Sequence, residues 1–100
     1  MNTNYVHIIM FEWDETKRQK NIEKHQLDFV DVVAVFDNPH VTIPSLYGGE
    51  ETRFITTGQL DGRFVTIIYT HRRRKIRVIS FRRARYDEKQ KYQELHGGRA

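Results

Sequence analysis

Eight arginines and lysines crowd into residues 71–85, in and around a stretch with the composition of a β-strand. Arg77 falls inside that stretch, on a stiff element that would hold its guanidinium in place. Arginine keeps its charge at physiological pH and offers a planar fork of donors that matches a phosphate group. The segment therefore indicates a phosphate-binding surface. The alternative is an arginine that lies along the sheet edge or pairs with a carboxylate.

Other residues that could carry chemistry are few. The sequence contains no GxxxxGK phosphate loop, no HExxH zinc motif and no GxSxG nucleophile motif. Its five histidines are scattered without metal-ligand spacing, so we expect no metal or other cofactor. His25 and His71 remain as candidate proton carriers, although His25 could equally be a cation that stabilises the end of a helix.

This inventory of cations and one or two histidines suits one reaction in particular, the cleavage of RNA by its own 2′-hydroxyl. The nucleophile is already present in the substrate. The protein must align it with the phosphorus, move protons and neutralise the charge that develops on the phosphate oxygens. Arginines can perform the last task without a metal ion.

The net charge of +4 conceals two halves of opposite sign. Residues 1–61 carry five Lys/Arg and ten Asp/Glu, a net of −5, whereas residues 62–100 carry twelve Lys/Arg and three Asp/Glu, a net of +9. A basic half of this density is typical of a protein that meets polyanions, although it could also be an ordinary solvated surface. The acidic half could be a complementary surface for a basic partner.

The length of 100 residues predicts a single domain, with its core over about residues 5–95 and flexible ends. The sequence has no cysteine, which excludes disulfides and fits a reducing compartment. The first residues, MNTNYVHIIMF, have neither the basic start of a signal peptide nor the long apolar run of a membrane span. We therefore expect a cytoplasmic protein that does not engage membranes.

The N-terminal part predicts a strand over residues 5–11 and two helices. The first helix covers about residues 15–25, with Asp14 as N-cap and Ile22 as its clearest inward residue. One face of this helix carries four polar residues at helical spacing: Lys17, Asn21, Lys24 and His25. Asp28 caps the second helix, whose inward residues follow the i, i+3, i+4, i+7 rule: Phe29, Val32, Val33 and Phe36.

The rest of the chain predicts an antiparallel sheet and a final helix. Residues 39–51 read as a connection with a short edge strand near 40–43, and strands over 53–59 and 63–70 form a hairpin around Asp61-Gly62. Residues 71–75 connect to a third strand over 76–81, followed by a helix over 87–95 and a disordered tail. The fold class is α+β: an antiparallel sheet of about four strands with two N-terminal helices and a C-terminal helix, which leave one sheet face available.

The segment FEWDETKRQKNIEKHQLDFVDVVAVFDNP resembles the N-terminal signature of BrnT toxins, the toxin half of a bacterial type II toxin–antitoxin pair. The matching features are Trp13-Asp14, Lys17, Asn21, Lys24-His25, Leu27-Asp28-Phe29, Ala34 and Phe36-Asp37. The resemblance covers about residues 11–92 and is long and specific. It continues through Glu51, Arg53, Gly58, Gly62, the run RVISFRRA over 77–84, Glu88 and Tyr92.

This resemblance implies a RelE-like fold and a metal-independent endoribonuclease that inhibits translation and growth. It implies RNA as substrate and a BrnA-type antitoxin with a ribbon-helix-helix domain as partner. The chain would form a hetero-oligomer with this antitoxin and would meet operator DNA only through it. By position it implies six site residues: Lys24, His25, Arg53, Arg77, Ser80 and Arg82. The arginines would clamp phosphate, Lys24 or His25 would transfer or orient a proton, and Ser80 would bind phosphate or hold an arginine.

Regular strand alternation predicts a conflict within this set. It places Ser80 and Arg82 on one side of the third strand, with Ile76 and Val78, and Arg77 on the other side. They can share one pocket only if a bulge or twist intervenes.

Three alternatives stay open. The segment Trp13-Asp14 and His25 could form a hydrogen-bonded lock of the helix instead of a site. The cluster 72–75, outside the family pattern, could widen the attraction for RNA or only lengthen a loop. The whole chain could be a non-catalytic module that binds nucleic acid or an antitoxin.

Overall fold

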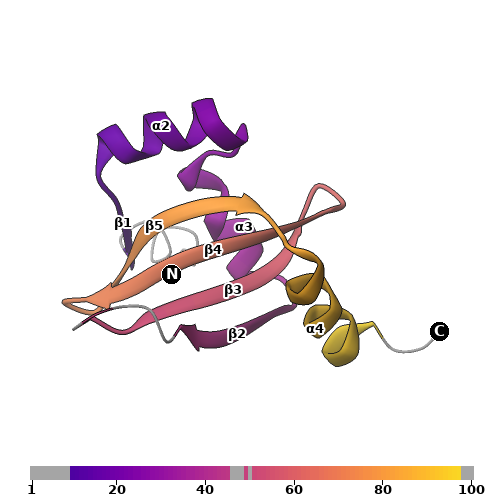
Figure 1. Cartoon of the computed structure of the whole chain (residues 1–100). Coiled ribbons are helices and arrows are strands. Elements are labelled where there is room, and N and C mark those ends of the chain that lie inside the picture. The colour runs from indigo at the N-terminus through magenta and orange to yellow at the C-terminus, as the bar shows by residue number, and fades with distance from the viewer. Residues whose placement is uncertain (1–9, 46–48, 50, 98–100) are drawn as a thin grey trace, which may run out of the picture.

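The computed structural model describes residues 10–45, 49 and 51–97. Within them the chain forms a five-stranded sheet in the order β1-β5-β4-β3-β2, accompanied by three helical segments (Figure 1). The α+β class is confirmed. The prediction of about four antiparallel strands is wrong in detail, because β1 (Phe11–Glu12) adds a fifth strand that runs parallel to β5.

The N-terminal strand expected over residues 5–11 is observed only at its end. Residues 5–9 lie outside the described residues, and Met10 is helical. The first predicted helix is confirmed as α2 (Glu15–His25), with the Asp14 side chain accepting a hydrogen bond of 3.0 Å from the Lys17 backbone N–H. The helix ends at Gln26, which adopts the left-handed conformation with φ of 56°.

The inward residue of α2 is Asn21 instead of the predicted Ile22. Asn21 is 7% exposed, and α2 lies along the free edge of β5 beyond the short strand β1 (Figure 1). Its Nδ2 donates to the Phe81 and Leu27 carbonyls at 2.8 and 3.0 Å, and its Oδ1 accepts from the Phe81 N–H at 3.2 Å. An amide side chain satisfies the buried edge of the strand, which an isoleucine cannot do.

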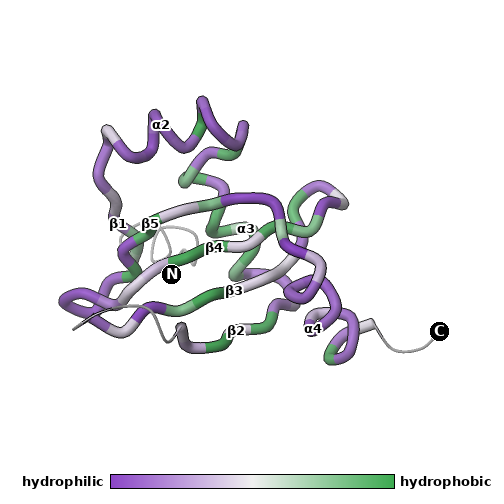
Figure 2. The backbone as a smooth tube through the Cα atoms, viewed as in Figure 1, coloured by the Kyte–Doolittle hydropathy of each residue, from purple (hydrophilic) through white to green (hydrophobic). Residues whose placement is uncertain are grey.

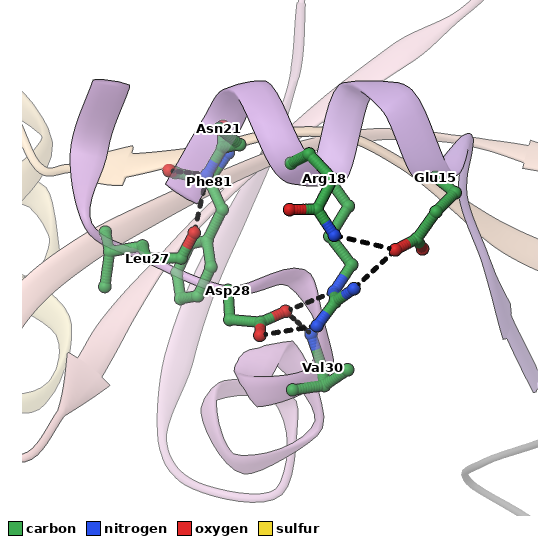
Figure 3. A network of polar contacts seen from close by, with 8 residues as sticks. Glu15, Arg18, Asn21, Leu27, Asp28, Val30 and Phe81 are labelled. Atoms are coloured by element: carbon green, nitrogen blue, oxygen red, sulfur yellow. Dashed lines mark hydrogen bonds and ion pairs between the residues drawn. The ribbon is translucent and has the colours of Figure 1, made fainter. Parts of the chain in front are cut away.

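The N-terminal half of α2 is fastened to the turn that follows the helix by Arg18 and Asp28 (Figure 3). Two guanidinium nitrogens of Arg18 donate to the two carboxylate oxygens of Asp28 at 2.8 and 3.0 Å, and the Val30 N–H donates to the same carboxylate at 3.1 Å. These donors, Arg18 first, hold the pKa of Asp28 below its usual value. In the described residues the Arg18–Asp28 pair therefore locks the helix to the turn. The alternative lock between His25 and Trp13-Asp14 is not formed there.

The second N-terminal helix is confirmed after Asp28, but its first turn is not α-helical. It starts as a 3₁₀ turn, η1 (Phe29–Asp31), and continues as α3 (Val32–Phe36). The tighter turn shifts the phase of the inward positions, so Val35 is fully buried while Val33 and Phe36 are half-buried. Nine buried apolar side chains form the core between these turns and the sheet: Leu27, Phe29, Val32, Val35, Val65, Ile67, Tyr69, Val78 and Phe81.

The antiparallel strands follow the predicted order. They are β2 (His40–Ser45) at the edge, β3 (Arg53–Leu60), β4 (Arg63–Arg72) and β5 (Lys75–Arg83). The hairpin around Asp61-Gly62 is confirmed, with both residues at positive φ. The connection expected over 71–75 is wrong, because the strands extend until Arg72 pairs with Lys75 and only two turn residues remain.

The final helix, α4 (Tyr86–His96), begins one residue earlier than predicted and ends one residue later. His96 is therefore helical, whereas residues 98–100 of the expected tail lie outside the described residues. α4 packs against β2 and β3 on the sheet face opposite α3, which we call the outer face (Figure 1). Helix α4 thus covers part of the outer face, so the prediction that one face is wholly available is wrong.

Candidate functional site

A β-bulge in β5 removes the conflict that regular alternation created. Ile68 of β4 pairs with Ser80, but the next residue, Tyr69, pairs with Val78, so Ile79 is an extra residue. Val78 and Phe81 consequently both enter the core although they are three positions apart. The predicted grouping of Val78 with Ser80 is wrong for this reason. The register instead places Arg77, Ser80 and Arg82 together on the outer face.

Arg53 and Arg77 lie in one row across the sheet. Thr70 of β4 pairs with Arg53 on one side and with Arg77 on the other. At the usual spacing of strands, the two arginine Cα atoms are about 10 Å apart. The row continues to Glu12 of β1, whose carboxylate lies 3.4 Å from a guanidinium nitrogen of Arg77. The register thus turns two arginines distant in sequence into neighbours on one surface.

The two arginines of this row differ in how they are satisfied. Arg77 is 30% exposed and shares a long, partly exposed ion pair with Glu12. The Nε of Arg53 is buried and makes no hydrogen bond within the part of the chain that the structure describes. A buried donor of this kind normally has a partner, and an oxyanion is a strong one for a guanidinium.

A basic groove runs between α2 and β5, with a volume of about 180 Å³. The groove is lined by all four polar α2 residues that were predicted to share a face. Lys20 of the same helix, the bulge residue Ile79 and its neighbour Ser80 complete the lining. These residues are Lys17, Lys20, Asn21, Lys24, His25, Ile79 and Ser80. Hydrophilic residues dominate the whole of α2 (Figure 2). Three predicted site residues, Lys24, His25 and Ser80, therefore meet at one groove.

His25 is poised toward its neutral form. Partial burial at the end of α2 lowers its pKa below the usual value, and the positive charges of Lys24 and Arg82 lower it further. A neutral imidazole can accept a proton, and a lowered pKa increases the neutral fraction of His25 near neutral pH.

Arg82 is committed to a carboxylate. Two of its guanidinium nitrogens donate to the two oxygens of Glu88, each at 2.9 Å, and the Thr66 hydroxyl and Arg85 N–H donate to the same carboxylate at 2.9 and 2.8 Å. Burial alone would raise the pKa of Glu88, but these donors outweigh it and hold the pKa at about 2. The pair ties α4 to β5. The guanidinium of Arg82 is therefore bound to a carboxylate more fully than those of Arg53 and Arg77.

Residue patterns alone missed several members of this arrangement. Lys20 lines the groove although it was not singled out, and Glu12 and Glu88 supply the carboxylates that face Arg77 and Arg82. A signal for Glu88 existed, since an acidic residue in the first turn of a predicted helix is suited to bonds with the preceding backbone. Within the described residues no group of three or more His, Asp or Glu could hold a metal ion, and no helix is long and apolar enough to cross a membrane.

Comparisons with known proteins give one family. A family model described as "Ribonuclease toxin, BrnT, of type II toxin-antitoxin system" matches residues 13–88. The crystal structure of the Brucella abortus ribonuclease toxin BrnT is similar, with a TM-score of 0.64 and 32% identity, over 76% of this chain and 97% of that one. No curated protein matches the sequence significantly.

Proposed function

Because the chain belongs to the BrnT family of ribonuclease toxins of type II toxin–antitoxin systems, we propose that it cleaves RNA by attack of the substrate's own 2′-hydroxyl on the adjacent phosphate, without a metal ion. The observation that carries this mechanism is the bulge at Ile79. It brings Arg77 and Ser80 to one face, about 7 Å apart along the strand and beside the groove that holds His25. Membership in a ribonuclease family sets aside the alternative of a non-catalytic module.

The proposed reaction needs a proton acceptor, a proton donor and fixed positive charge. His25, held toward the neutral form, takes the proton of the 2′-hydroxyl as that oxygen forms a bond to phosphorus. The bond from phosphorus to the 5′-oxygen breaks, and that oxygen receives a proton from Lys24 or from water. The products are a 2′,3′-cyclic phosphate and a free 5′-hydroxyl.

The arginines of the cross-strand row supply the charge. Arg77 and Arg53 face the phosphate, where their donors strengthen as negative charge builds on its non-bridging oxygens. Ser80 lines the basic groove and can donate to the phosphate. Arg82 is better suited to positioning, because it fastens α4 and its charge lowers the pKa of His25.

An RNA cleavage assay in EDTA tests the mechanism. We expect purified protein to cut single-stranded RNA with EDTA present and to leave 2′,3′-cyclic phosphate ends, detectable by mass spectrometry. A matched RNA with one 2′-O-methyl group should resist cleavage at that position only. Loss of cutting in EDTA, or products with 3′-hydroxyl ends, would contradict the proposal.

The pH dependence of the same assay tests the role of His25. We expect the rate to fall on the acid side with a midpoint below pH 6.5, because protonated His25 cannot accept a proton and its pKa is lowered. His25→Gln should cut about 10²–10⁴-fold more slowly and lose this acid limb. An unchanged acid limb in the variant would assign it to another group.

The antitoxin partner follows from the family, and we propose that it is of the BrnA type, with a ribbon-helix-helix domain that brings the hetero-oligomer to operator DNA. We propose that this chain acts on RNA in the cytoplasm. Co-expression with the product of the adjacent gene should relieve growth arrest and yield a stable complex. Arrest that persists despite a soluble neighbour would argue against that pairing.

A further inference from the structure

The turn between β4 and β5 carries a cluster of exposed cations, which we call the basic tip: Arg72, Arg73, Arg74 and Lys75. It projects from the sheet at the end away from α4, and hydrophilic residues cover it (Figures 1 and 2). One ion pair in the described residues touches the tip, between Arg72 and Glu51 at 3.7 Å, and both side chains are largely exposed. Such a pair leaves the positive field of the tip largely intact.

The backbone of the tip is poorly suited to the residues it carries. Arg73 and Arg74 form the two-residue turn with φ of 52° and 69°, both in the left-handed region. A hairpin turn of this kind is best filled by Asn-Gly, because side chains with a bulky stem are strained there. The turn forms although arginine is unfavourable at both positions. The backbone geometry therefore does not explain why the two residues are arginines.

The basic tip continues the proposed phosphate-binding surface. Arg72 pairs with Lys75, and the alternation of both strands places this pair on the outer face, next to the row that contains Thr70 and Arg77. From Ser80 to Lys75 the distance along β5 is about 13–17 Å at the usual rise of a strand. Arg77, Arg72 and Lys75 therefore share one face between the groove beside α2 and the end of the hairpin, with Glu12 and Glu51 beside them.

We propose that the basic tip is an accessory site for the phosphate backbone of single-stranded RNA, outside the residues that surround the cleaved bond. This inference rests on the proposed function and extends its substrate-binding surface. Guanidinium groups on an exposed hairpin suit phosphates, which they bind without regard to sequence. An acidic protein segment is disfavoured because the tip is continuous with the arginines that face the scissile phosphate. The tip holds the strand and thereby raises affinity.

The double variant Arg73→Asn/Arg74→Gly tests this inference without risking the fold, because Asn-Gly is the preferred sequence for this turn. The probe is a 20-nucleotide RNA with 2′-O-methyl groups throughout, which cannot be cut by the proposed mechanism. Its affinity is measured by fluorescence anisotropy over a range of NaCl concentrations. We expect the magnitude of the negative slope of log K against log salt to be smaller by about 1.4 in the variant. Each phosphate contact to a single strand contributes about 0.7, and the variant loses two arginines. If wild type and variant bind equally at 1 M NaCl, the variant should then bind on the order of 20-fold more weakly than wild type at 0.1 M NaCl.

Two controls separate position from charge. Arg63→Gln/Arg83→Gln removes the same charge from exposed residues at the opposite end of β4 and β5, and should leave the slope unchanged. Arg73→Lys/Arg74→Lys keeps the charge and should retain most of the affinity. An unchanged slope in the Asn-Gly variant, or an equal loss in the distant control, would overturn the inference.

Outcomes of this experiment separate the basic tip from the cleavage mechanism. Wild-type protein that binds the methylated probe through the tip but leaves ordinary RNA intact would contradict the mechanism and uphold the tip. If the protein cleaves ordinary RNA but the salt slope is the same in wild type and in the Asn-Gly variant, the mechanism is upheld and the inference about the tip is wrong. If the Asn-Gly variant instead loses affinity for its antitoxin and retains the RNA slope, the tip is a protein-binding surface and the inference is wrong.

Discussion

Replacing Arg77 with alanine is expected to lower kcat/KM for RNA cleavage by about 10²–10³-fold, the usual effect of removing one fixed donor from a developing oxyanion. Arg77 lies near the start of β5, in one row with Arg53 and two residues before the bulge at Ile79. Ser80, two pairing positions further along β5, lines the basic groove. Cleavage is measured in EDTA on the same RNA for wild type and variant.

The fold should tolerate this change, since Arg77 and Glu12 form a partly exposed pair that contributes at most about 1 kcal/mol. The circular-dichroism spectrum of the variant should therefore match that of wild type. Arg77→Lys retains the charge but loses the planar fork, and should recover only part of the rate. Glu12→Gln removes the ion-pair partner and should keep most of the activity. If Arg77→Ala cuts normally, or Glu12→Gln is equally inactive, Arg77 does not bind the reacting phosphate.

Local sequence signals predicted the elements on which this site is built. Asp14 marks the start of α2, and Asp61-Gly62 marks the hairpin, because capping and turn preferences are decided within a few residues. The shared face of α2 followed from helical spacing alone, and the structure places all four of those residues on the groove. The resemblance to BrnT toxins, confirmed by the family match over residues 13–88, identified the ribonuclease class.

What the sequence could not provide depends on contacts between distant segments. Nothing in the run Val78-Ile79-Ser80 signals a bulge, since no glycine marks it, and the extra residue is fixed by pairing with β4 and by the need to bury both Val78 and Phe81. Likewise Asn21 faces inward only because β1 is too short to cover the edge of β5. The parallel pairing of β1 is itself two residues long, below the length at which a strand pattern can be recognised.

Replacement of the Glu88 side chain is expected to destabilise the fold strongly. Glu88 is 8% exposed, and its carboxylate accepts four hydrogen bonds from Arg82, Arg85 and Thr66. Replacing Glu88 with alanine leaves Arg82, which is 15% exposed, without its counter-ion, and should lower the free energy of unfolding by about 3–5 kcal/mol. Urea denaturation at pH 7 measures this change. A midpoint close to that of wild type would show that the pair contributes little.

The pH dependence of unfolding gives an independent test of the same pair. Glu88 has a pKa of about 2 in the folded protein against an ordinary value of 4.5, so its contribution is complete above pH 4.5 and disappears as the pH falls toward 2. The shift corresponds to about 3 kcal/mol of stability lost over that window. Glu88→Gln, which cannot titrate, should lose less stability over the same range. Arg82→Met/Glu88→Met should be more stable than Glu88→Ala, because removing both charges leaves none uncompensated. A double variant no more stable than the single one would mean that the hydrogen bonds to Thr66 and Arg85, and not the ion pair, hold α4 in place.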